Sequence, residues 1–137
     1  MKTFEVVFSS DIKQVNKIVK GALAYISENI PKADAEELME IRLILSELLF
    51  NAIIHGNKSD SEKLVRLKIE ADGNIISSVI SDEGNGFDFG RLSYHNSEPS
   101  IDEHGRGIML VKALVDSFTY SKTGNRVLFS KKVGVHV

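Results

Sequence analysis

The sequence predicts an α+β fold, a two-layer α/β sandwich in which helices cover one face of a mixed, mostly antiparallel sheet. A stretch from Ile12 carries apolar residues at helical spacing, and the stretch that follows it is a helix apolar almost all the way round. Short segments rich in β-forming residues follow, and a glycine turn joins two of them as an antiparallel pair. Helices grouped against such strands bury their apolar faces on one side of the sheet.

The individual elements follow from local patterns along the chain. Apolar residues three and four positions apart predict the helices, and Asp72-Gly73 predicts the hairpin turn between the two middle strands. Either Ser10 or Asp11 caps the first helix and Asp34 caps the second, because short polar side chains accept from the first free N–H groups. The expected elements are a strand at 3–8, helices at 12–30 and 34–55, strands at 64–71 and 74–81, a loop at 88–104, a helix from 105, and strands at 118–121 and 126–133.

Length and composition favour one globular domain over residues 1–137. The chain has 42% hydrophobic and 26% charged residues, which is ordinary for such a domain, and no cysteine, which excludes disulfides and thiolate metal sites. A formal net charge of -2 gives no basic field, so we expect no direct contact with nucleic acid. No apolar run reaches the ~20 residues of a membrane span and none resembles a signal peptide, so we expect a cytoplasmic protein without membrane contact.

The second helix, which Gly56 is expected to end, carries a polar stripe on an otherwise apolar surface. Glu47, Asn51 and His55 recur every four residues and therefore share one face. The amide oxygen of Asn51 suits Mg²⁺, and the carboxylate of Glu47 can accept a proton from an attacking hydroxyl or water. For this helix alone, the simpler interpretation is favoured, in which Glu47 pairs with a buried Lys or Arg and Asn51 caps a neighbouring segment.

A strand end followed by glycines forms the second candidate segment. Asp82 precedes Gly84, Gly86 and Phe87. Glycine lets a flat ring approach the backbone, and Asp82 can accept a hydrogen bond from an exocyclic amine such as that of adenine. The alternative is a turn that requires glycine for its own conformation.

The third candidate segment is expected at the start of the third helix. Gly105, Arg106 and Gly107 precede Ile108, and glycines at a helix N-terminus leave free N–H groups and a positive dipole end for phosphate. Arg106 can add charge there, whereas the alternative is an ordinary flexible connection. The chain contains no Walker A sequence, which excludes a P-loop nucleotide site.

Together, the three segments resemble the nucleotide-binding motifs of the Bergerat-fold ATPases, a superfamily that includes the histidine kinases. The motifs are Glu47-x-x-x-Asn51-Ala52-x-x-His55-Gly56-Asn57, Asp82-x-Gly84-x-Gly86-Phe87 and Gly105-x-Gly107-Ile108. They cover nearly the whole chain, and the loop before the third motif resembles the ATP lid of that superfamily. The chain is most similar to the anti-sigma factor serine/threonine kinases, because it adds almost nothing to this domain and carries a Glu-Leu-Leu-x-Asn-Ala pattern.

The resemblance implies that the chain binds ATP and Mg²⁺. Asn51 would ligand the metal ion, Glu47 would act as the catalytic general base, and Asp82 would bind the adenine amine. Gly84 and Gly86 would shape the adenine pocket, and residues 105–107 would hold the phosphates under the lid. The residues implied in nucleotide binding are Asn51, His55, Asp82, Gly84, Gly86, Phe87, Gly105, Arg106, Gly107 and Ile108.

The implied function is that of an anti-sigma factor with protein serine/threonine kinase activity. Such a protein sequesters a sigma factor and phosphorylates an anti-anti-sigma antagonist of the sulfate-transporter/anti-sigma-antagonist fold. Two alternatives stay open: a detached histidine kinase ATPase domain, and a nucleotide-sensing binding module without turnover. Homodimerisation also stays open. The chain departs from the superfamily near its last turn, where Gly124 is followed by Asn125 and Arg126 instead of threonines.

Overall fold

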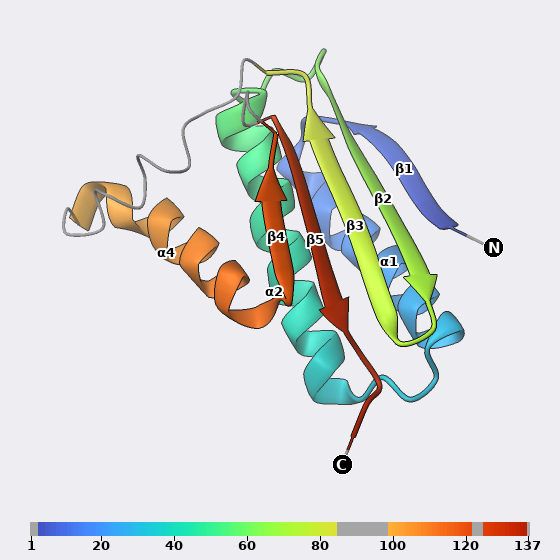
Figure 1. Ribbon diagram of the computed structural model, residues 1–137. Helices are drawn as coiled ribbons and strands as arrows, with labels where there is room; N and C mark the ends of the chain where they lie inside the picture. Colours follow the sequence, from blue (N-terminus) through green and yellow to red (C-terminus); the bar gives the residue numbers. More distant parts are fainter. Residues whose placement is uncertain (1–2, 85–98, 122–124, 137) are drawn as a thin grey trace.

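The computed structural model describes residues 3–84, 99–121 and 125–136, with the backbone alone for 99–106. Its sheet has the strand order β1-β2-β3-β5-β4, and every pairing is antiparallel (Figure 1). This architecture confirms the predicted α+β sandwich, although no described strand pair is parallel, so the sheet is not mixed. The strands are β1 (Thr3–Ser9), β2 (Leu64–Asp72), β3 (Ile75–Asp82), β4 (Ser117–Tyr120) and β5 (Arg126–Lys132).

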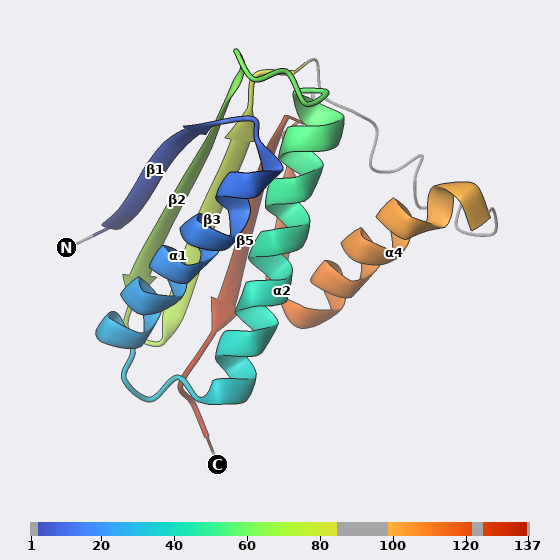
Figure 2. The same cartoon turned by 180° about the vertical axis from the view of Figure 1, so that it is seen from behind.

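The helices form a second layer on one face of this sheet. α1 (Val15–Asn29) and α2 (Ala35–Asn51) lie side by side across it, and α4 (Pro99–Leu114) lies beside α2 at the edge near β4 (Figures 1 and 2). Two short turns extend the helices, η1 (Ile12–Gln14) before α1 and η2 (Ala52–Gly56) after α2. None of the helices in the described part of the chain is long and apolar enough to cross a membrane.

α2 is the centre of the hydrophobic core. Its residues Ile44, Leu45 and Leu49 are 0% exposed, because they lie on the side of the helix that faces the sheet. The strands contribute every second side chain to the same core, as Val65 and Leu67 do on β2. The buried apolar side chains thus fix the position of α2, and the polar side chains near its C-terminal end are held in place with it.

Helix caps in the N-terminal half settle one open alternative. Asp11, not Ser10, caps the first turn, because its side chain accepts from the N–H of Lys13 at 2.9 Å. Asp34 caps α2 as predicted, in a capping box with Glu37, where each side chain accepts from the backbone N–H of the other residue.

The third helix begins at Pro99, so the predicted start at Gly105 is wrong. Proline suits the first turn of a helix because its missing N–H would have no partner there. The predicted loop therefore includes the first turns of α4, and Gly105 and Gly107 lie inside the helix. The rest of the predicted lid falls within 85–98, with Gly86 and Phe87, and lies outside the described residues.

Candidate functional site

α2 passes directly into η2, a single π-helical turn. The N–H of Asn57 donates to the carbonyl of Ala52, five residues back, at 2.9 Å. Such turns are rare in proteins, and those that occur are often found at functional sites. The sequence correctly ends the helix near Gly56, but the π turn was not predicted. The wider turn removes His55, which is half-buried, from the regular spacing on which the predicted stripe depended.

Asn51 is a buried amide at the end of α2. It is 4% exposed, and its Nδ2 has no hydrogen-bond partner among the residues that the structure describes. An unsatisfied buried donor costs about 1–3 kcal/mol, so this arrangement is unfavourable unless another group accepts from the amide. Within those residues Nδ2 caps no neighbouring segment, contrary to the simpler interpretation. The buried hydroxyl of Ser78 on β3 also has no partner within the described ranges, but it is the smaller polar group.

Glu47 lies one helical turn before Asn51 and faces α4. A Cβ on Gly107 would overlap the side chain of Glu47, so the glycine leaves room for Glu47 in its present position between the two helices. Glu47 is half-buried, which leaves part of its side chain accessible. The structure thus brings together Glu47 and Gly107 from the first and third predicted motifs.

Asp82 and two glycines form a tight cluster at the end of β3. The N–H of Gly84 donates to Oδ1 of Asp82 at 2.8 Å. A Cβ on Gly56 would overlap the Asp82 carboxylate, and a Cβ on Gly84 would overlap the carbonyl of Gly56. Gly84 thus allows a close approach of protein backbone from Gly56, whereas the predicted approach of a ligand ring stays a prediction.

The side chain of Asn57 holds the cluster around Asp82 in place through hydrogen bonds to the neighbouring strand ends. It is 0% exposed, and its Nδ2 donates to Oγ of Ser10 at 2.7 Å and to the carbonyl of Leu64 at 2.9 Å. Its Oδ1 accepts from the N–H of Glu83 at 2.8 Å. Asn57 thereby joins the ends of β1, β2 and β3 next to η2. Asn57 is the last residue of the first predicted motif, but the sequence predicted no role for it.

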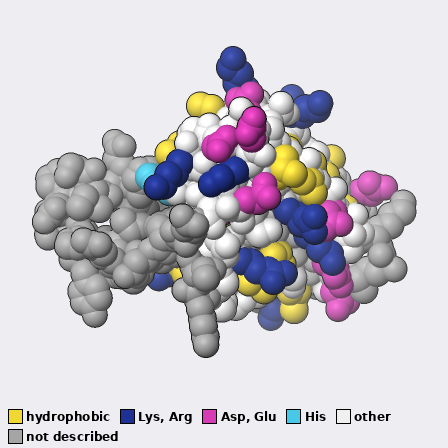
Figure 3. Space-filling view, turned by 90° about the horizontal axis from the view of Figure 1, so that it is seen from above, with side chains coloured by type: hydrophobic (Ala, Val, Ile, Leu, Met, Phe, Trp, Pro, Cys, Tyr) yellow, Lys and Arg dark blue, Asp and Glu magenta, His cyan; other side chains and the backbone are white. Residues whose placement is uncertain are grey.

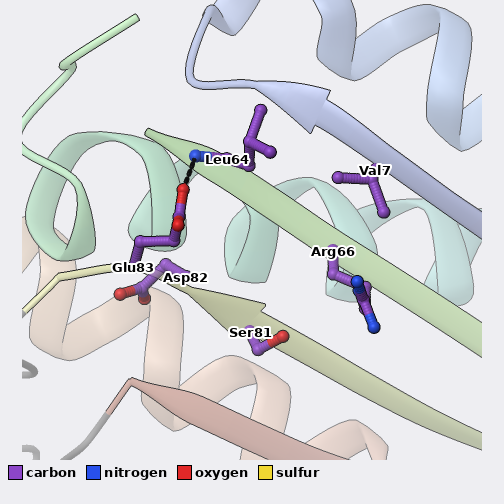
Figure 4. A pocket seen from close by; sticks show the side chains of 6 residues that line it. All are labelled: Val7, Leu64, Arg66, Ser81, Asp82 and Glu83. Carbon is purple, nitrogen blue, oxygen red and sulfur yellow. Dashed lines mark hydrogen bonds between the residues drawn. The ribbon is translucent and has the colours of Figure 1, made fainter. Parts of the chain in front are cut away.

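The opposite face of the sheet has its own small cavity at the same strand ends. Its volume is about 210 Å³, and Figure 4 shows the side chains that line it. Glu83 turns toward β2 and accepts from the N–H of Leu64. Neither Glu47 nor Asn51 lines this cavity, so it is distinct from the space that those residues face. The lining residues are Val7, Leu64, Arg66, Ser81, Asp82 and Glu83.

Comparison with known proteins decides the family. Residues 8–131 match the histidine kinase-like ATPase domain. The chain belongs to this family. It is 31% identical to a protein named Anti-sigma F factor from Clostridium perfringens over 104 residues, which span 72% of this chain and 74% of that protein. A protein of the same name from Geobacillus thermodenitrificans is 27% identical over 106 residues, which span 75% of this chain and 71% of that protein. Another from Anoxybacillus flavithermus is 29% identical over 103 residues, which span 72% of this chain and 69% of that protein.

Several residues near the third predicted motif and the last turn lie in surroundings that the sequence did not predict. Ile108 is 3% exposed and packs in the hydrophobic core, where it secures α4. The backbone of Gly105, Arg106 and Gly107 is helical, so the free N–H groups expected at a helix start are not found there. Asn125, the departure from the family pattern, supports the Asp82 turn: its carbonyl accepts from the N–H of Asp82 at 3.0 Å.

A second group of potential metal ligands lies at the start of α2. Asp34, Glu37 and His136 place one ligand atom each within 4.8 Å of one another. Both carboxylates already accept from backbone N–H groups of the capping box. The carbonyl of Lys32, with the two carboxylates, raises the pKa of the His136 ring. Capping and docking of the C-terminal segment thus account for this group without a metal ion.

The carboxyl of Asp82 is electrostatically costly in the ATPase domain. Burial raises its pKa above the ordinary value of 3.8, against the smaller lowering effects of the Gly84 N–H and the Lys63 charge. A raised pKa means that the folded state binds the proton more tightly than the unfolded state. The stability that the protonated Asp82 carboxyl contributes is therefore complete below pH 3.8, and it is lost as the pH rises through the raised pKa of the folded state.

Substitution of Asp82 by asparagine tests this cost. Asp82→Asn keeps an oxygen for the Gly84 N–H and removes the charge, so we expect a domain at least as stable as wild type at about pH 7. The advantage should shrink as the pH falls toward 3.8. Urea unfolding across this range measures it, with exposed Asp72→Asn as the control. Asp82→Asn less stable than wild type at neutral pH would contradict the assignment.

Two glycine substitutions should separate stability from geometry. In Gly84→Ala the new Cβ meets the backbone of Gly56, so we expect a loss of about 1–3 kcal/mol in the free energy of unfolding. In Gly107→Ala the Cβ meets only side-chain atoms of Glu47, from Cγ to the carboxylate. This side chain can rotate, and alanine favours a helix by up to about 1 kcal/mol. Gly107→Ala should therefore unfold no more easily than wild type. Equal losses for both variants would contradict these contacts.

Proposed function

We propose that this domain binds Mg-ATP in the region bounded by the end of α2, the Asp82 turn and α4. The observation that carries the proposal is the buried amide of Asn51, whose Nδ2 has no acceptor among the described residues. Phosphate oxygens are strong acceptors for such a donor, and an amide oxygen is a suitable ligand for Mg²⁺. Membership of an ATPase domain family supports the same ligand.

The Asp82 turn is proposed to receive the adenine ring. The Asp82 carboxylate is partly buried at the end of β3, where it can accept a hydrogen bond from the exocyclic amine. Gly56 and Gly84 carry no side chains, and the space that a Cβ would fill is taken by the Asp82 carboxylate and the Gly56 carbonyl, so these glycines set the position of the carboxylate that would bind the amine. A donor from the base would also stabilise the charge that burial makes costly.

Glu47 is proposed as the general base for phosphoryl transfer. Its half-buried carboxylate lies one turn from Asn51 and against Gly107, so it is positioned near the proposed metal site by two helices. Phosphoryl transfer depends mainly on positioning and charge stabilisation, to which a bound Mg²⁺ contributes by neutralising phosphate charge. Glu47 would accept the proton of the attacking hydroxyl.

The biological role proposed is that of a cytoplasmic anti-sigma factor with serine/threonine kinase activity. The similar proteins are named Anti-sigma F factor, which supports a sigma factor as the partner. The phosphoacceptor would be a serine or threonine of an anti-anti-sigma antagonist. The whole chain would act as one ATPase domain, because the family match covers 8–131 of its 137 residues.

Two substitutions on α2 distinguish binding from transfer. Asn51→Ala should weaken Mg-ATP binding by about tenfold or more while unfolding stays cooperative, because the amide serves the ligand and not the core. Glu47→Gln should keep ATP binding within about threefold but lower label transfer from ATP to the antagonist by about 10²–10⁴-fold. Glu36→Gln, an exposed residue in the first turn of α2, is the matched control.

The outcomes separate the candidate functions. Undiminished transfer in Glu47→Gln would contradict the role of this carboxylate. Label on a partner histidine would favour a histidine kinase ATPase domain. ATP binding without turnover by the wild type, together with tight sigma factor binding, would reduce the function to that of a nucleotide-sensing module.

A further inference from the structure

The outer surface of the helical layer carries a cavity lined by positive charge. Its volume is about 570 Å³, and no acidic residue contributes to its lining. The helices α1 and α2 that form it lie side by side on one face of the sheet (Figure 2). The lining residues are Lys13, Asn16, Lys17, Lys20 and Arg42, which we call the basic cavity.

Helix geometry explains why these side chains gather. Lys13, Lys17 and Lys20 are spaced at i, i+4 and i+7 along η1 and α1, so they project from one face. The opposite face of α1 packs in the core, which fixes the orientation of the charged face toward solvent. Arg42 of α2 adds a fourth charge, and all four cationic residues are exposed.

The positive charges of the basic cavity are not neutralised within the described residues. The ion pairs found there involve Lys131 and His136 and none of these four side chains. Neighbouring like charges repel, and the chain as a whole is acidic with a net charge of -2, so its composition does not account for the cluster. On the end of the molecule seen in Figure 3, acidic, basic and hydrophobic side chains are intermixed.

Exposed apolar side chains lie next to the basic cavity in the sequence of both helices. Ile12, which precedes Lys13, is 51% exposed. On α2, Met39 lies one turn before Arg42 and is 69% exposed, and Leu43 directly follows Arg42 and is 44% exposed. A surface that combines apolar contacts with positive charge suits a segment that has an apolar side and an acidic side. Bare phosphate or nucleic acid would leave those apolar side chains uncovered.

We propose that the basic cavity is a docking site for an acidic, amphipathic helical segment of a partner protein. Carboxylates of this segment would pair with the four cations, and its apolar residues would cover Met39 and Leu43. Arg42 offers a forked donor that matches a carboxylate. Neither Asn51 nor Asp82 lines the cavity, so the site is separate from the proposed nucleotide site and does not depend on it.

The test uses a fluorescein-labelled peptide of about 14 residues with Glu on one helical face and Leu on the other. We expect it to bind the full chain with an affinity that falls as salt rises, and to shift the backbone NMR resonances of 12–20 and 39–43. The double variant Lys17→Glu/Lys20→Glu should bind about tenfold or more weakly. The control, Lys68→Glu/Lys132→Glu, changes the net charge equally at exposed sheet positions and should bind within about threefold of wild type.

Three results would overturn the proposal. The first is equal peptide binding by both double variants, and the second is the absence of NMR shifts at 12–20 with millimolar peptide. The third is equally tight binding of a matching peptide that has Lys in place of Glu. Short single-stranded RNA that produces the same shifts at lower concentration than the peptide would also overturn it, in favour of nucleic acid. Mg-ATP affinity measured on Lys17→Glu/Lys20→Glu should equal that of wild type, so the outcome is independent of the proposed nucleotide site.

Discussion

The buried amide of Asn51 is the constraint on which the account of this ATPase domain depends. An apolar helix at the centre of the core carries a carboxamide whose nitrogen lacks an acceptor in the described part of the chain. Core packing alone would favour an apolar residue there, since an unpaired buried donor costs about 1–3 kcal/mol. A ligand that supplies an acceptor removes this cost, which links the stability of the helix end to binding.

The surroundings of Asn51 show how the fold keeps such a site in shape. The π turn carries the backbone from Asn51 to Gly56, which packs against Asp82 and Gly84. Asn57 then ties the ends of three strands together with side-chain hydrogen bonds that satisfy both ends of its amide. The two asparagines thus differ in role: the side chain of Asn57 is saturated by the protein, whereas the Nδ2 of Asn51 has no acceptor among the residues that the structure describes.

Much of the fold could be predicted because it depends on local chemistry. The Asp34 cap, the Asp72-Gly73 turn and the apolar periodicity of α1 all act within a few residues, and the structure confirms them. The start of α4 could not, because Pro99 suits a loop as well as a first helical turn, and glycines lower helix propensity. The contact between Gly56 and Gly84 joins distant segments, which periodicity does not reveal.

Paramagnetic broadening by Mn²⁺, substituted for Mg²⁺ with ATP, tests the central claim most directly. The account predicts that the side-chain amide resonances of Asn51 broaden first, with those of the Asp82 turn affected less by the metal and shifted by the base. Broadening centred on Asp34, Glu37 and His136, at the opposite end of α2, would contradict the account. So would an unchanged Asn51 amide at saturating Mn-ATP.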